Sequence, residues 1–290
     1  MILRVLLLIF MILIICYILF IYLRVNGYEY LLNNGMYNII GCNTNFMNYG
    51  YWTKDTNTLA EASIKLVEKL IDKNKKKFDQ ANKILDIGCG RGMQDVIFTK
   101  YTNADIYAID INPNNIKECN KLAKKHKIQD KLNYITADAC NLPFDNDSFD
   151  VVVSLESAFH YPSRETFINE VKRVLRPGGC FILGDIIINK KTGYLKYLQK
   201  FICNRINVNI IHDKDLPHLI NNLDKHNFKY DIEDITDSTF IPFYRNSKQK
   251  FCCDNYIIYI TYIITINILM YLQNKTNIFS YIIANCVKPK

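Results

Sequence analysis

The stretch Leu85-Asp86-Ile87-Gly88-Cys89-Gly90-Arg91-Gly92 decides the fold of this chain. The apolar residues that open it predict a strand, and the periodic residues from 93 to 100 predict a helix directly after it. Glycines at such a turn let the backbone approach a ligand, and the N–H groups that open the helix face anionic atoms. The spacing G-x-G-x-G differs from the G-x-G-x-x-G that is typical of nicotinamide dinucleotide binding. Asp86 can accept from an ammonium group, which nicotinamide cofactors lack, so the stretch predicts a loop for another cofactor.

Strand-like and helix-like segments alternate beyond this loop. The strand-like runs are 84–87, 106–109, 132–135, 151–155 and 181–188, and the helix-like stretches lie near 93–100, 115–126 and 165–175. Arg176-Pro177-Gly178-Gly179 predicts a sharp helix stop and a turn before the fifth strand. The alternation predicts an α/β fold with a parallel sheet covered on both faces.

Two further aspartates follow strand-like runs. Asp110 ends the run 106–109, and Asp138 lies in Thr136-Ala137-Asp138-Ala139-Cys140 after the third run. A carboxylate after the second strand can accept from ribose hydroxyls, and Asp138 could accept from an adenine amino group. Each aspartate alone is compatible with a turn former or a helix cap. Three carboxylates at three successive strand ends, however, indicate a ligand site, because ligands of open α/β sheets bind there.

With these elements, residues 47 to 290 resemble the class I S-adenosylmethionine-dependent methyltransferases. Phe149-Asp150-Val151-Val152-Val153-Ser154 and Arg173-Val174-Leu175-Arg176-Pro177-Gly178-Gly179 look like signatures of the small-molecule branch, which contains sterol, tocopherol, quinone and sugar methyltransferases. The resemblance implies a Rossmann-like, doubly wound mixed sheet of seven strands with 229–236 as the sixth. The last strand, 280–287, would be antiparallel.

The resemblance also implies a cofactor and its site. S-adenosylmethionine would be the methyl donor, and the scheme requires no metal ion. The resemblance implies that Asp86, Gly88 and Gly90 hold the methionine part of the cofactor. It implies Asp110 for the ribose, and Asp138 with Ala139 for the adenine.

Two other segments resemble parts of the same branch. Leu155-Glu156-Ser157-Ala158-Phe159-His160-Tyr161-Pro162 is similar to a segment beside the transferable methyl group, where His160 could take a proton from the acceptor. The alternative is a histidine that shapes the pocket or caps the next helix. Asn48-Tyr49-Gly50-Tyr51-Trp52 is similar to an element that closes over the cofactor, where Tyr49 or Trp52 could pack near the sulfonium. Simple packing is the alternative for these aromatic residues.

An uncharged apolar segment of 19 residues, 5–23, lies near the N-terminus between Arg4 and Arg24. Its length predicts a single transmembrane helix, with residues 1–25 as the anchor. A cleaved signal peptide is the alternative, but no small-residue cleavage site follows. The similar charges on both sides leave the orientation open. A second apolar stretch, 256–272, is at the lower limit for spanning and predicts a buried or lid-forming helix, with membrane contact as the alternative.

The domain organisation follows from these segments. Residues 26–58 form a connector and a cofactor-covering segment, and residues 59–290 form the methyltransferase domain. Insertions at about 189–213 and 248–275 would form the lid and much of the acceptor pocket. Since the sequence from 189 to 213 matches nothing recognisable, the acceptor remains open.

Composition excludes several classes of protein. The formal net charge of +8 over 290 residues is spread over short lysine clusters, whereas nucleic-acid binding calls for a concentrated basic stripe. An anionic membrane surface fits the charge. The ten cysteines and five histidines lack the spacings of a zinc site. Free thiols then indicate a reducing, cytosolic compartment for the catalytic domain.

Three functional hypotheses follow. The first is methyl transfer to a small, lipophilic acceptor at a membrane. The second is a tethered methyltransferase of a soluble sugar or amine, and the third is a non-catalytic cofactor-binding or scaffold protein. The intact glycines and aspartates favour an enzyme over the third hypothesis.

Overall fold

The computed structural model describes residues 45–205, 214–247, 267 and 270–290. The predicted membrane segment 5–23, the first part of the connector and most of the stretch 256–272 lie outside these residues. Among the helices of the described residues, none has the length and apolar character needed to cross a membrane.

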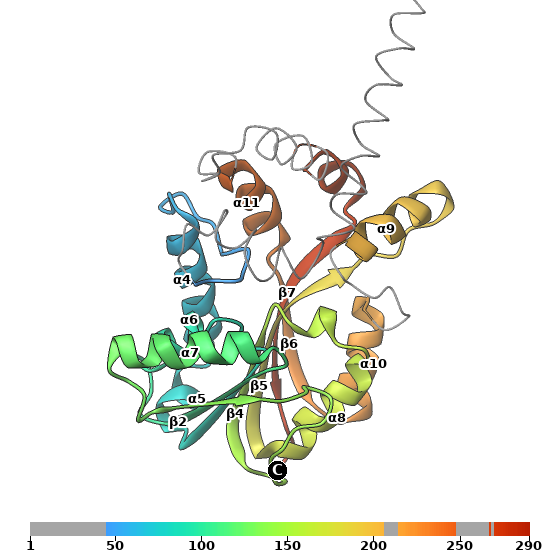
Figure 1. The fold of residues 1–290 in the computed structure, drawn as a ribbon. Helices are drawn as coiled ribbons and strands as arrows, with labels where there is room; N and C mark the ends of the chain where they lie inside the picture. Colours follow the sequence, from blue (N-terminus) through green and yellow to red (C-terminus); the bar gives the residue numbers. More distant parts are fainter. Residues whose placement is uncertain (1–44, 206–213, 248–266, 268–269) are drawn as a thin grey trace, which may run out of the picture.

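A seven-stranded sheet forms the centre of the molecule, in the order β3-β2-β1-β4-β5-β7-β6 (Figure 1). Neighbouring strands among β1 to β5 are parallel, and β7 runs antiparallel to both β5 and β6. The predicted doubly wound mixed sheet with an antiparallel last strand is therefore confirmed. The strands are β1 (Lys83–Ile87), β2 (Asp105–Asp110), β3 (Leu132–Thr136), β4 (Phe149–Leu155), β5 (Leu175–Ile188), β6 (Lys229–Asp234) and β7 (Phe279–Val287).

Helices cover both faces of the sheet. Successive strand residues alternate between two core layers because strand side chains point to opposite faces. Ile84 and Val151 belong to the layer that contains α4, whereas Leu85 and Val152 belong to the layer that contains α8 and α10. Figure 1 shows α4 and α6 on one side of the sheet and α8 and α10 on the other. The helices are α4 (Leu59–Asp72), α5 (Lys75–Gln80), α6 (Met93–Phe98), α7 (Pro113–His126), α8 (Arg164–Val174), α9 (Gly193–Arg205), α10 (Leu216–Lys225) and α11 (Phe240–Ser247).

Local signals explain where two of these helices begin. Thr58 and Glu61 form a capping box at the start of α4, in which each side chain accepts the N–H of the other residue. Asn112 caps α7 through the N–H of Asn114, and Pro113 occupies the first turn, where its missing N–H costs nothing.

The turn predicted for residues 176–179 is wrong. Helix α8 ends at Val174 and β5 begins at once, with Leu175 paired to Phe149. The register then shifts, so that Cys180 pairs with Val151 and the intervening residues form a bulge. Backbone hydrogen bonds between this bulge and Lys288 replace the turn that Pro and Gly indicate locally.

Candidate active site

The glycine loop between β1 and α6 has a backbone that only glycine adopts easily. Gly88, Gly90 and Gly92 have φ angles of 79°, 56° and 79°. A Cβ atom on Gly88 would lie 2.4 Å from the Cβ of Ser157, and one on Gly90 would lie 2.9 Å from Sδ of Met47. The loop therefore leaves bare backbone at the carboxyl end of the sheet.

Asp110 ties this loop to the end of β2. Its Oδ2 accepts the N–H of Gly90 at 3.0 Å, and its Oδ1 accepts the N–H of Asn112 at 2.8 Å. Burial raises the pKa of Asp110 above its ordinary value, while these N–H groups act in the opposite direction. A carboxylate has about four lone-pair sites, so Asp110 can still accept from a ligand.

Asp86, which the resemblance places at the methionine part of the cofactor, does not itself line the cavity. Its side chain is fully buried at the end of β1, and its Oδ2 accepts Nε2 of Gln94 at 2.5 Å. Its Oδ1 has no hydrogen-bond partner within the described part of the chain. Burial raises the pKa of Asp86 to about 6, and it is Gln94, not Asp86, that lines the neighbouring cavity.

A second buried carboxyl, which the sequence analysis missed, adjoins Asp86. Asp95 on α6 is fully buried, and burial together with the charge of Asp86 holds its pKa well above the usual range. Two close carboxylates do not both ionise easily, so each disfavours the charged form of the other.

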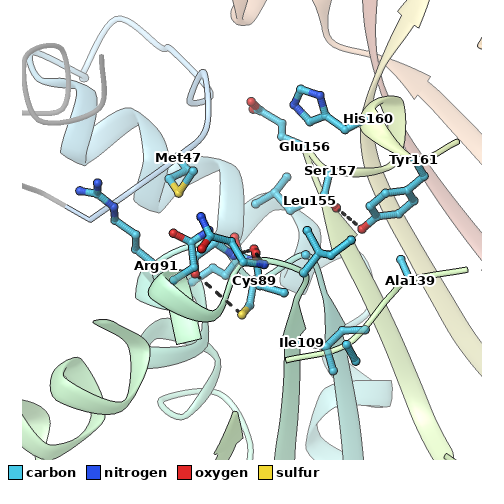
Figure 2. A pocket seen from close by; sticks show the side chains of 18 of the residues that line it. Met47, Cys89, Arg91, Ile109, Ala139, Leu155, Glu156, Ser157, His160 and Tyr161 are labelled. Carbon is cyan, nitrogen blue, oxygen red and sulfur yellow. Dashed lines mark hydrogen bonds between the residues drawn. The ribbon is translucent and has the colours of Figure 1, made fainter. Parts of the chain in front are cut away.

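A cavity of about 300 Å³ opens above the glycine loop (Figure 2). It gathers most of the predicted site residues, although these come from four different strand ends. Those that line it are Gly88, Gly90, Asp110, Asp138, Ala139 and His160. Lining residues that sequence reasoning did not single out include Met47, Gln94, Glu156 and Tyr161.

Asp138 and Ala139 lie together after β3, on the same cavity wall. Asp138 is exposed, and its Oδ1 accepts the N–H of Cys140 at 2.8 Å, whereas Ala139 is buried. Asp138 thus forms the local turn that the sequence allows and also lines the cavity.

The predicted aromatic cover differs from the structure. Trp52 is buried in the core and donates from Nε1 to the carbonyl oxygen of Tyr49. The Tyr49 ring packs edge to face on Phe240 and Phe243, with centroids 5.1 and 4.7 Å apart. Neither Tyr49 nor Trp52 is among the cavity-lining residues, and the same segment contributes Phe46 and Met47 instead.

Glu156 follows β4 in a strained conformation. Its φ is +50°, a value that non-glycine residues rarely adopt outside functional sites, and its N–H is held by the carbonyl oxygen of Gly184 at 2.7 Å. Its Oε1 accepts the N–H of Tyr49 and the O–H of Tyr281, each at 2.8 Å. Burial raises the pKa of Glu156 to about 8. The carboxyl group is therefore poised to exchange a proton near neutral pH.

His160 stands close to Glu156 at the same end of the cavity. It closes the short helix η2 (Ala158–His160), and its ring lies against Phe159 with centroids 4.0 Å apart. Figure 2 shows both side chains coming from the segment after β4. The position is compatible with both predicted roles, the base and the pocket-shaping residue.

Hydroxyl groups fix this segment to the glycine loop. Oγ of Ser157 and the O–H of Tyr161 both donate to the carbonyl oxygen of Ile87, at 3.0 and 3.2 Å. Ser154 adds a third hydroxyl, 2.9 Å from Ser157. The residues beside Glu156 therefore keep a fixed place relative to the cofactor loop.

This strand order, with its antiparallel β7, its glycine loop and its carboxylates after successive strands, is the arrangement that the resemblance to the class I S-adenosylmethionine-dependent methyltransferases implies. Residues 85–183 match a family model described as a methyltransferase domain. The match is confined to these residues, and it supports the class that the sequence predicts.

Two curated methyltransferases are similar to part of this chain. An erythromycin 3''-O-methyltransferase of Saccharopolyspora erythraea is 34% identical over 143 residues, which are 49% of this chain and 46% of the relative. A sterol 24-C-methyltransferase of Candida albicans is 32% identical over 118 residues, or 41% of this chain and 31% of the relative. The chain spans about half the length, or less, of the curated relatives it matches.

Solved structures share the fold over a longer part. A geranyl diphosphate C-methyltransferase from Streptomyces coelicolor, in complex with Mg²⁺, geranyl diphosphate and S-adenosyl-L-homocysteine, has a TM-score of 0.69 and 16% identity, covering 90% of this chain and 96% of that one. The cyclase SpnF has a TM-score of 0.71 and 18% identity, covering 90% and 94%. Because a cyclase has the same fold, the argument for function must come from the site.

Proposed function

We propose that the chain transfers the methyl group of S-adenosylmethionine to a small, lipophilic acceptor at a membrane. The observation that carries the proposal is the continuity of the cavity. One end has the glycine loop and the strand-end carboxylates, and the other end has Glu156 and His160.

The residues present suit S-adenosylmethionine. Gly88 and Gly90 bring loop backbone in a left-handed conformation to the cavity wall, and Asp110 can accept from ribose hydroxyls. Asp86 accepts from Nε2 of Gln94, which lines the cavity, so its carboxylate can act on an ammonium group through Gln94. When bound, the cofactor supplies an activated methyl group on a sulfonium sulfur.

The protein contributes alignment, exclusion of water and a proton acceptor. With the cofactor held by the glycine loop and Asp110, the acceptor atom would take the methyl group, and the electron pair of the C–S bond would remain on sulfur. If the acceptor atom carries a proton, Glu156 takes it, because its pKa of about 8 makes it a competent base near neutral pH. His160 is the alternative base on the same wall. Holding the partners in line supplies most of the remaining acceleration.

A lipophilic acceptor is supported by two independent features. Relatives include a sterol 24-C-methyltransferase and phthiotriol/phenolphthiotriol dimycocerosates methyltransferases, whose names refer to lipids. The uncharged segment 5–23 has the length of a membrane anchor. A single-pass anchor with the catalytic domain in a reducing, cytosolic compartment would bring the cavity to such acceptors.

Calorimetric titration of the full chain in detergent micelles with S-adenosylmethionine tests the cofactor. Asp110→Ala should weaken binding tenfold or more, because hydrogen bonds to charged groups contribute about 1.5–3 kcal/mol each. The matched control is Asp105→Ala, at the exposed start of the same strand, which should bind as the wild type does. No saturable binding by the folded wild type would overturn the proposal and leave a scaffold.

Transfer of a radiolabelled methyl group then tests the acceptor class. Membrane lipid extract and soluble extract are offered in parallel, and we expect label in the lipid fraction. Label only in polar products would refute the lipophilic acceptor and select a tethered enzyme of sugars or amines. Glu156→Gln should keep cofactor affinity and lose transfer to acceptors that must give up a proton. Unchanged transfer by this variant would assign the proton to His160 or to no base.

A further inference from the structure

Two donors from distant parts of the chain converge on one oxygen atom of Glu156. One donor is the N–H of Tyr49, which lies in the segment before α4. The other is the O–H of Tyr281 in β7, a residue that pairs with Ile186 of β5. Both distances are 2.8 Å, and both donors reach Oε1. Within the described residues, Oε2 has no hydrogen-bond partner, while the side chain lines the cavity.

Tyr281 is a permanent donor at this position. Its side chain is fully buried, and burial together with the charge of Glu156 holds the pKa of its phenol well above the ordinary value. The O–H therefore stays protonated over the working range and has one acceptor, Oε1. Its backbone is also fixed, because its N–H donates to Oγ1 of Thr236 and its carbonyl oxygen accepts the N–H of Ile235.

We propose that Tyr281 is a positioning residue: with the N–H of Tyr49 it holds Oε1 of Glu156, so that Oε2 is the oxygen that takes the acceptor's proton. The inference rests on the proposed role of Glu156 as the base. Tyr281 acts through Glu156 and does not contact the acceptor. Its second effect is energetic, since a donor to the charged carboxylate favours the ionised form.

Other charged groups around Glu156 set the background for this effect. Asp185 on β5 is fully buried, and its charge acts to raise the pKa of Glu156. Arg164 pairs with Asp185, and Nζ of the buried Lys214 bonds the carbonyl oxygen of Tyr161 at 2.7 Å, so two cations lie near the same segment. Among the described residues, His160, Tyr161 and the Tyr49 phenol are further titratable groups on the adjoining elements. None of these is altered when only the phenol oxygen of residue 281 is removed.

The test is a pH titration of the Glu156 carboxyl in the full chain in detergent micelles, by ¹³C NMR with carboxyl-labelled glutamate. The signal is assigned by its loss in Glu156→Gln. In the wild type the midpoint should lie near pH 8. In Tyr281→Phe it should rise by about one unit or more, since a lost charge-assisted hydrogen bond is of that size.

The matched control is Tyr101→Phe. It removes a phenol that donates to Oε1 of Glu68 at 2.8 Å, and neither residue lines the cavity. Its Glu156 midpoint should equal that of the wild type. A second variant carries site-specific 3-fluorotyrosine at position 281, which is isosteric but a stronger donor, and should lower the midpoint. Circular dichroism and thermal unfolding establish that each variant is folded. The 3-fluorotyrosine variant keeps the inference testable if Tyr281→Phe fails to fold.

An unchanged midpoint in folded Tyr281→Phe, or a shift equal to that of the control, overturns the inference. So does a midpoint that does not fall with 3-fluorotyrosine. These outcomes are independent of cofactor binding, which is measured separately by calorimetry. Loss of binding by the wild type would refute the proposed function while leaving the Tyr281 to Glu156 contact open to the same titration. Where an acceptor is in hand, the acid limb of the pH–rate profile should move upward with the NMR midpoint.

Discussion

Replacing Gly88 by alanine should separate backbone strain from steric conflict at the cofactor loop. Gly88 has a φ of +79°, and its new Cβ would meet Cβ and Oγ of Ser157 at 2.4 and 2.5 Å and the O–H of Tyr161 at 2.8 Å. The left-handed conformation costs a non-glycine residue about 1–3 kcal/mol. Overpacking adds about 1–3 kcal/mol because the hydroxyl network must shift. Gly193→Ala is the control, since its φ is +58° but nothing lies within 4 Å of its new Cβ.

Thermal unfolding of the full chain in micelles, followed by circular dichroism, measures the difference. The steric part alone should make the Tm of Gly88→Ala lower than that of Gly193→Ala by about 2 to 12 °C. Cofactor affinity should fall only in Gly88→Ala. The double variant Gly88→Ala/Ser157→Gly removes the colliding Cβ, so its loss in Tm should be smaller than the sum of the losses in Gly88→Ala and Ser157→Gly. Equal Tm losses in Gly88→Ala and Gly193→Ala, or additive losses in the double variant, would refute the steric reasoning.

Two further predictions concern ion pairs. Arg164→Met leaves the buried Asp185 unpaired and should lower the free energy of unfolding by about 3–5 kcal/mol in urea titrations, whereas Arg164→Met/Asp185→Leu should lose much less; equal losses would contradict the ion-pair argument. Burial acts to raise the pKa of Asp150, but Arg176 and the backbone N–H groups that donate to its carboxylate lower the pKa below the unfolded value of 3.8. The ionised Asp150 therefore stabilises the fold above about pH 4. This stabilisation is lost as the pH falls through the pKa of the folded state. The stability difference between the wild type and Asp150→Asn should therefore shrink below about pH 4 in acid titrations, and a difference that stays constant through this range would contradict the argument.

Strands β4 and β5 could be predicted from the sequence because each contains an almost continuous apolar run, as buried parallel strands do, whereas the mostly polar β6 was implied only by the family resemblance. The run 151–155 and strand β4 (Phe149–Leu155) differ by only two residues. The failure at 176–179 has a distant cause. Proline and glycine indicate a turn locally, but backbone contacts with Lys288, more than a hundred residues away, keep the segment in the sheet.

The site could be predicted in part, namely where a residue is required by the local backbone. Glycines at 88 and 90 answer a local backbone requirement, so spacing alone reveals them. Depth in the protein is not encoded by spacing, and Asp86 therefore lies beneath the cavity wall instead of in it. The importance of Glu156 depends on Tyr281, which is 125 positions along the chain. No local pattern reports such a contact.

The position of β7 also has a consequence for synthesis on the ribosome. This strand follows all others in the sequence of the described residues, yet it lies between β5 and β6. Until it emerges, β5 has an open edge, β6 has no strand to pair with, and the phenol that holds Glu156 is absent. A nascent chain can therefore form the glycine loop early, while its proton acceptor takes its final place only when β7 closes the sheet.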